Sequence, residues 1–132
     1  MTTAFYAGLL AILFIVLSFR VIAKRNQYKV AIGSDGQVLL ERSIRVHANF
    51  AEYVPFALLL MFLAEYSGLA PLYLHILGIA LVVGRLSHAF GVSQQQEPLK
   101  FRVFGMILSM LVILAAAFAC IVLYALRSGW LL

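Results

Sequence analysis

Long apolar segments, separated by short polar ones, divide the chain into four parts. A helix needs about 20 mostly apolar residues to cross the roughly 30 Å hydrocarbon core of a bilayer. Three of the segments reach that length, and the last carries no charged side chain. The pattern predicts an all-α integral membrane protein, a four-helix bundle whose spans lie at about 3–23, 42–66, 69–90 and 103–126.

The second span differs from the others because part of it is polar. Its apolar part, Tyr53–Ala64, would measure only about 18 Å as a helix, at about 1.5 Å per residue. Extending it back to Arg42 gives a full span, and the added turns include Arg45, His47, Asn49 and Glu52. The segment is either a short hairpin element or a complete span with polar groups for a function. An even number of compact spans favours the complete span.

Composition places the chain among membrane proteins. Hydrophobic residues make up 64% of the sequence and charged residues 11%, whereas soluble domains hold about 45–50% and about 25%. A soluble globular enzyme is therefore excluded, and the length leaves room for one domain, 1–132. The net charge of +5 indicates membrane topology and no nucleic-acid partner. The single cysteine, Cys120, excludes an intramolecular disulfide and a multi-cysteine metal site, and we expect no metal.

Basic residues are distributed unevenly between the two ends of the predicted bundle. Nine of the ten lie at or near the first and third connections: Arg20, Lys24, Arg25, Lys29, Arg42, Arg45, Arg85, Lys100 and Arg102. Arg127 lies at the opposite end. By the positive-inside rule the two connections face the cytoplasm. We therefore expect both termini in the periplasm of a bacterial inner membrane.

One face of the second span gathers polar side chains. Residues three, four or seven positions apart stack along one side of a helix, and this stripe consists of Glu41, Arg42, Arg45, Asn49, Glu52 and Tyr53. Glu52 lies roughly 15 Å inward from Arg42 along the axis. An ionisable group at that depth is costly, so its carboxylate needs a partner or a water-filled cavity.

The other spans bring polar groups to the cytoplasmic boundary as well. Arg25 closes the first span, Arg85 and His88 lie one turn apart near the end of the third, and Arg102 opens the fourth. This polar layer predicts a pocket for an anionic, hydrogen-bonding ligand, open sideways to the bilayer. Arginine suits a carboxylate ligand because its planar fork can bind both oxygens.

The sequence also leaves purely structural roles open for these residues. A buried network without a ligand could be formed by Arg45, Asn49, Glu52 and Arg85, and Arg102 could be an interfacial anchor. His47 projects away from the stripe, toward another helix or a neighbouring subunit. Glu65 closes the second span, and we expect it to be solvated.

The second span opens with a run of fifteen residues that carries the polar stripe. This run is Glu41-Arg-Ser-Ile-Arg45-Val-His47-Ala-Asn49-Phe-Ala-Glu52-Tyr53-Val-Pro55. It resembles the signature of the MAPEG family, membrane-associated proteins in eicosanoid and glutathione metabolism. That signature is Glu-Arg-x-x-Arg-x-(His/Gln)-x-Asn-x-x-Glu-(Tyr/Phe)-x-Pro, and the spacing here matches throughout. Two further segments match family motifs. They are Gly84-Arg85-Leu-Ser-His88 in the third span, and Phe101-Arg102 followed by Gly105-Met106 at the start of the fourth. The resemblance covers essentially the whole chain and looks closest to the short bacterial branch.

The resemblance implies a homotrimer with glutathione bound, in a bent shape, between adjacent subunits. In the family, arginines hold the glutathione carboxylates and the glutamate holds its amino group. Carried over by position, contacts to glutathione would come from Arg25, Arg45, Asn49, Glu52, Tyr53, Arg85 and His88, with His47 from the neighbouring subunit. Arg102 would match the arginine that stabilises the glutathione thiolate, which makes it the predicted catalytic residue.

The implied chemistry needs no protein nucleophile. A thiol with a pKa of about 8.5 is mostly protonated at neutral pH, and a nearby guanidinium favours the thiolate, which is the nucleophile. Glutathione is then a co-substrate, and a lipophilic electrophile would arrive from the bilayer. Two positions depart from the family's pattern: Val92 stands where many members have a tyrosine, and Gln94–Gln96 stand where others are more basic.

Three functions are compatible with these residues. The first is a glutathione-dependent transferase or peroxidase acting on a lipophilic electrophile. The second is a non-catalytic member that binds lipid or a thiol ligand, which Val92 and the glutamine-rich loop suggest. The third is a small proton-coupled multidrug exporter. Such exporters have a buried glutamate, and Glu52 could be its equivalent. Arg45 and Arg85 argue against the exporter because they would repel a cationic substrate.

Overall fold

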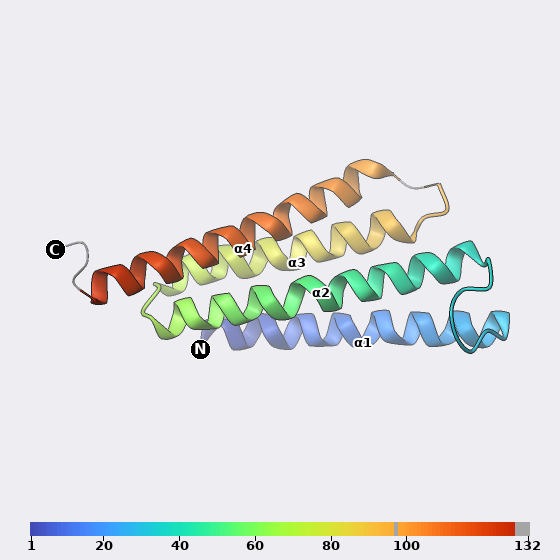
Figure 1. Cartoon of the computed structure of the whole chain (residues 1–132), viewed down its shortest axis with the longest axis horizontal. Coiled ribbons are helices and arrows are strands. Elements are labelled where there is room, and N and C mark those ends of the chain that lie inside the picture. The colour runs from blue at the N-terminus through green and yellow to red at the C-terminus, as the bar shows by residue number, and fades with distance from the viewer. Residues whose placement is uncertain (97, 129–132) are drawn as a thin grey trace.

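The computed structural model describes residues 1–96 and 98–128 as four long helices joined by short loops (Figure 1). The helices are α1 (Thr2–Tyr28), α2 (Val38–Tyr66), α3 (Pro71–Ser93) and α4 (Leu99–Arg127). Each is long and apolar enough to cross a membrane. The predicted all-α, four-helix membrane fold is confirmed.

The helices extend beyond the apolar segments. α1 continues through its basic residues to Tyr28, and α2 is one uninterrupted helix from Val38 through its polar half. A helix satisfies its own backbone hydrogen bonds, so it can continue past the hydrocarbon core into the headgroup region. The first loop turns where Gly33 and Gly36 adopt φ of 72° each, a left-handed conformation that glycine adopts at little cost.

The two middle helices hold the bundle together. α2 and α3 each pack against all three other helices, whereas α1 and α4 share no close contact among the described residues. Figure 1 shows α1 and α4 on opposite sides of the pair α2 and α3. The start of α1 and the end of α4 lie at one end of the molecule, and the first and third connections lie at the other.

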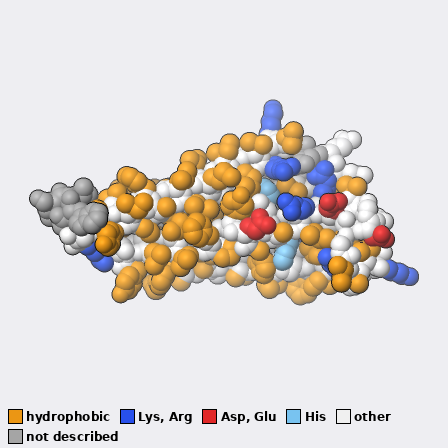
Figure 2. All heavy atoms as spheres, viewed as in Figure 1, with side chains coloured by type: hydrophobic (Ala, Val, Ile, Leu, Met, Phe, Trp, Pro, Cys, Tyr) orange, Lys and Arg blue, Asp and Glu red, His pale blue; other side chains and the backbone are white. Residues whose placement is uncertain are grey.

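Apolar side chains form both the core and most of the surface. Leu10, Val46, Leu81 and Val112, one from each helix, are at most 2% exposed. The visible face in Figure 2 is largely covered by hydrophobic side chains, with charged groups gathered toward the end that holds the first and third connections. An outward apolar surface is what a helical bundle presents to lipid.

Close contact between α3 and α4 fixes the geometry of the charged end. Gly84 and Gly105 face each other where the helices meet, and a Cβ at Gly105 would lie 2.6 Å from the backbone nitrogen of His88. Farther along, a Cβ at Gly91 would lie 2.7 Å from the backbone nitrogen of Arg102. Small residues let helix backbones approach closely in membranes. The glycines therefore set the positions of His88 and Arg102 relative to each other.

Glu65 is partly exposed, and its role goes beyond the expected solvation because it caps the start of α1. Its carboxylate accepts hydrogen bonds from the backbone N–H groups of Thr2 and Thr3, the second at 2.9 Å. The first N–H groups of a helix have no partner inside it, so a carboxylate there satisfies them. The sequence pattern could not reveal this cap because Glu65 ends α2 and the groups it binds begin α1.

Candidate functional site

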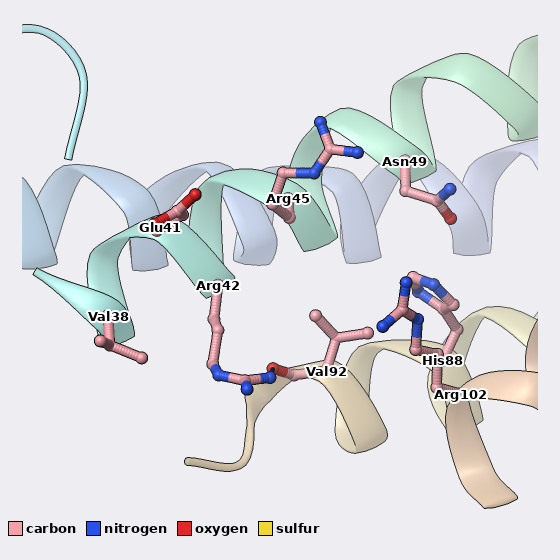
Figure 3. A pocket seen from close by; sticks show the side chains of 8 residues that line it. All are labelled: Val38, Glu41, Arg42, Arg45, Asn49, His88, Val92 and Arg102. Carbon is pink, nitrogen blue, oxygen red and sulfur yellow. Dashed lines mark hydrogen bonds between the residues drawn. The ribbon is translucent and has the colours of Figure 1, made fainter. Parts of the chain in front are cut away.

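A pocket of about 270 Å³ opens at the charged end of the bundle, between the first half of α2, the end of α3 and the start of α4 (Figure 3). Its lining side chains are Val38, Glu41, Arg42, Arg45, Asn49, His88, Val92 and Arg102. Four predicted site residues from three helices are thus brought together: Arg45, Asn49, His88 and Arg102.

Arg42 crosses the pocket from α2 to α3. Its Nη1 donates a hydrogen bond of 3.2 Å to the carbonyl oxygen of Val92, as the approach of the two groups in Figure 3 also shows. The last carbonyls of a helix have no intrahelical partner and carry partial negative charge, so they attract a cation. Arg42 therefore joins α2 to the end of α3 and closes one side of the pocket.

The pocket carries an excess of positive charge. Three arginines line it, Arg42, Arg45 and Arg102, against the single carboxylate of Glu41. Arg45 and Arg102 are solvent-exposed, whereas His88 is only 5% exposed. Hydrogen-bond donors and positive charge from two helices suit an anion better than any other ligand. Within the described residues no three His, Cys, Asp or Glu side chains form a metal-binding group.

Arg85 lies behind this pocket and does not line it. The residue is only 1% exposed, and its Nη1 donates a hydrogen bond of 2.9 Å to Oδ1 of Asn49. Its Nη2 contacts the sulfur of Met106 at 3.7 Å, and the guanidinium carbon lies 6.0 Å from the centre of the Tyr53 ring. The structure therefore places Arg85 in a buried contact between three helices.

Glu52 and Tyr53 line an adjoining groove between α2 and α4. This groove holds about 430 Å³, and its other lining residues are Phe56, Met110, Ile113 and Leu114. The Glu52 side chain is exposed, and no other described residue forms an ion pair or hydrogen bond with its carboxylate. The groove thus presents a carboxylate beside an otherwise apolar surface, open to the side of the bundle.

Two predicted site residues lie away from the pocket. The Nε2 of His47 hydrogen-bonds with Oγ of Ser18 at 3.0 Å, and its ring stacks on Phe14 with 4.7 Å between centroids. His47 is therefore a contact between α2 and α1, one of the two placements that the sequence predicted. Arg25 donates from Nη1 to the carbonyl oxygens of Ala31 at 3.1 Å and Gly33 at 3.0 Å, which ties it to the first loop.

Arg42 and Met106 are not among the site residues predicted from the sequence. Arg42 lies on the predicted stripe, one turn before Arg45, and that position was the available signal for its place in the pocket. Met106 follows the glycine at which α4 meets α3, but nothing in the sequence indicates that its sulfur meets a guanidinium. The contact depends on how α3 and α4 are rotated.

Comparison with known proteins decides the family. The sequence matches the MAPEG family over residues 3–122. The chain belongs to the MAPEG family. It is 44% identical over 91 residues to inner membrane protein YecN of Escherichia coli strain K12, which covers 69% of this chain and 70% of YecN. The same values hold for YecN of Escherichia coli O6:H1 strain CFT073. With its four apolar helices, this MAPEG protein is a multi-pass inner-membrane protein.

Proposed function

We propose that this MAPEG protein is a glutathione-dependent transferase or peroxidase that binds glutathione in the pocket and activates its thiol toward a lipophilic electrophile. The observation that carries the proposal is the convergence of arginines from α2 and α4, with Asn49 and His88, around one pocket at the charged end of the bundle. Glutathione is a dicarboxylate at neutral pH, and guanidinium groups bind carboxylates through short, charge-assisted hydrogen bonds.

The geometry suggests how glutathione would lie. Its carboxylates would meet Arg45 and Arg42, and its amino group would reach Glu52, which lies about one helical turn beyond Asn49. Its thiol would face Arg102, whose positive charge favours the thiolate. The apolar groove beside Tyr53 opens sideways and would admit a lipophilic electrophile from the bilayer. Each step uses side chains of this chain without a protein nucleophile.

We further propose that the protein assembles as a homotrimer with glutathione held between subunits. In a single chain the exposed carboxylate of Glu52 sits beside apolar side chains, an arrangement that is costly in contact with lipid. A second copy would cover it and could bring the first loop, with Arg25, toward a neighbour's pocket. Native mass spectrometry of detergent-purified protein is expected to give three copies, and a monomer at all detergent concentrations would contradict this.

The pocket would face the cytoplasm, with both termini in the periplasm. The basic residues gather at the pocket end, and positive charge is retained on the cytoplasmic side of inner-membrane proteins. A cytoplasmic pocket has direct access to a water-soluble thiol.

Calorimetric titration of glutathione into the detergent-purified protein tests the proposal. We expect saturable binding that Arg45→Ala weakens by about 10- to 100-fold, because hydrogen bonds to a charged group contribute roughly 1.5–3 kcal/mol. Arg20→Ala is the matched control, since Arg20 is an exposed arginine of α1 that does not line the pocket. Absence of binding at millimolar glutathione would refute the proposal.

One observation favours a second candidate, a non-catalytic protein that binds lipid or a thiol ligand. The side chain of Val92 lines the pocket and is only 7% exposed, so an apolar group stands where many MAPEG members have a phenol. Conjugation of a generic electrophile separates the two functions. Tight glutathione binding without turnover would favour the non-catalytic protein.

A further inference from the structure

Arg85 is a buried cation that lies behind the pocket, and the Asn49 side chain connects it to the pocket. It is 1% exposed, it comes from α3, and no carboxylate among the described residues pairs with it. Among the described residues, its one hydrogen bond to an oxygen is to Oδ1 of Asn49 on α2, at 2.9 Å. Asn49 in turn lines the pocket. Asn49 is therefore the link between the buried guanidinium and a ligand.

The chemistry of the two groups permits one arrangement. A guanidinium has five N–H donors and no acceptor, whereas an asparagine amide offers an oxygen acceptor on one side and an NH₂ donor on the other. Only the oxygen can face Arg85, because the turned amide would place donors against donors. Figure 3 shows the Asn49 oxygen on the side nearer α3, in agreement with this requirement.

We propose that Arg85 is a positioning residue, which holds the Asn49 carbonyl so that the amide N–H groups of Asn49 are the ones left to bind the ligand in the pocket. The inference rests on the proposed function for the identity of that ligand. Without Arg85 the amide can present its oxygen instead, and an oxygen acceptor repels a carboxylate. Arg85 thus determines whether Asn49 adds a donor or an acceptor to an anion pocket.

Two further contacts fix the guanidinium itself. Its Nη2 meets the Met106 sulfur of α4 at 3.7 Å, and the Tyr53 ring of α2 lies 6.0 Å from its central carbon. A thioether is a weak acceptor and an aromatic face attracts a cation. Because neither competes strongly for an N–H donor, Asn49 receives the strongest hydrogen bond that Arg85 makes.

The Asn49 amide can be observed directly by NMR, because the sequence contains only two asparagines, Asn26 and Asn49. Labelling asparagine with ¹⁵N in the full chain gives two side-chain NH₂ signals, and exposed Asn26 is the internal control. We expect slow exchange between the two Asn49 N–H positions in the unsubstituted chain, since a guanidinium at the oxygen strengthens the partial double bond to nitrogen. Arg85→Met should speed this exchange to the value of Asn26, and Arg85→Lys should give an intermediate rate. An unchanged Asn49 exchange rate in folded Arg85→Met would overturn the proposal.

Glutathione affinity supplies the second measurement. We expect Arg85→Met to weaken binding about tenfold, the effect of losing one hydrogen bond to a ligand. In the Asn49→Leu background, Arg85→Met should have almost no additional effect because Arg85 acts through the amide. A full additional loss there would show that Arg85 touches the ligand itself and would refute the positioning role. If the unsubstituted chain bound no glutathione, the proposed function would fail, whereas the NMR comparison would still decide what Arg85 does to Asn49.

Discussion

Burial separates two kinds of arginine in this protein. Arg45 and Arg102 are exposed at the pocket, whereas Arg85 is enclosed and donates a hydrogen bond to Asn49. Replacing Arg85 would leave a cavity between the helices and would deprive Oδ1 of Asn49 of its hydrogen-bond donor. Substitutions of the exposed arginines should therefore alter ligand binding or chemistry, and substitution of Arg85 should also alter stability.

Arg102 should affect the thiol more than it affects binding. We expect Arg102→Gln to lower the rate of glutathione conjugation at least tenfold, because an adjacent positive charge lowers a thiol pKa by about one unit or more. Glutathione affinity should fall less than in Arg45→Ala. The ultraviolet absorbance of the glutathione thiolate in the complex measures thiol ionisation directly. Undiminished thiolate absorbance in the Arg102→Gln protein would contradict the role of Arg102 in thiol activation.

The sequence predicts the polar stripe on α2 well, but it predicts poorly which residues of the neighbouring helices that stripe contacts. Helical periodicity and the family motif together place Arg45, Asn49, His88 and Arg102 at one depth, and the structure brings them to one pocket. Periodicity does not say how neighbouring helices are rotated. That rotation leaves Glu52 in the adjoining groove and decides that His47, predicted to face another helix or subunit, meets Ser18 of α1.

Contacts between helices determine whether the pocket exists at all. Its walls come from α2, α3 and α4, and the separation of the last two is set by glycines that allow backbone to meet backbone. A side chain added at that contact would move α4, and Arg102 with it. Pocket geometry and bundle stability are therefore coupled through a position that touches no ligand.

Gly105→Ala tests this coupling. We expect it to destabilise the bundle by about 1–3 kcal/mol, the usual cost of overpacking, because the new Cβ would meet the backbone of His88 at 2.6 Å. Gly8→Ala is the control, since nothing lies within 4 Å of its added Cβ. Thermal unfolding in detergent should show a lower midpoint for Gly105→Ala only. Equal midpoints for the two variants would refute the role of the close contact.

The start of α1 depends on a single carboxylate from α2. Replacing Glu65 by alanine leaves the N–H groups of Thr2 and Thr3 without their acceptor, and loss of a cap costs about 0.5–2 kcal/mol. Hydrogen exchange should become faster in the first turn of α1 and stay unchanged at the charged end of the bundle. Asp35→Asn, in the first loop, is the control for loss of a negative charge. Slow exchange in Glu65→Ala would contradict the cap.

At the scale of the whole molecule, charge and connections define two ends. Apolar length predicts three of the four helices because a lipid core demands about 20 apolar residues for each span, whereas the second span reaches that length only with its polar turns from Arg42 onward. The helix ends are less predictable, since α1 and α2 continue through charged residues that solvent and headgroups can accommodate. The cap at Glu65 and the tie of Arg25 to the first loop both depend on contacts that become visible only in three dimensions.

Cysteine labelling tests the proposed orientation. In a Cys120→Ala background, which removes the single cysteine, we expect Ser67→Cys to react with an impermeant maleimide in intact spheroplasts. Gln95→Cys, in the third connection, should react only after the membrane is opened, because the positive-inside rule retains that side in the cytoplasm. The reverse pattern would place the pocket in the periplasm.

The start of α1 and the end of α4 share one end of the molecule, opposite the pocket. Two copies can therefore be joined head to tail by a soluble linker, without an additional membrane crossing and without crowding the pocket end. Such a concatemer of the proposed homotrimer would let Arg45→Ala be introduced into one, two or three of its copies. The number of intact pockets in each assembly would then be fixed by the gene and not by random mixing of subunits. Activity measured against that number would show whether the pockets work independently or in turn.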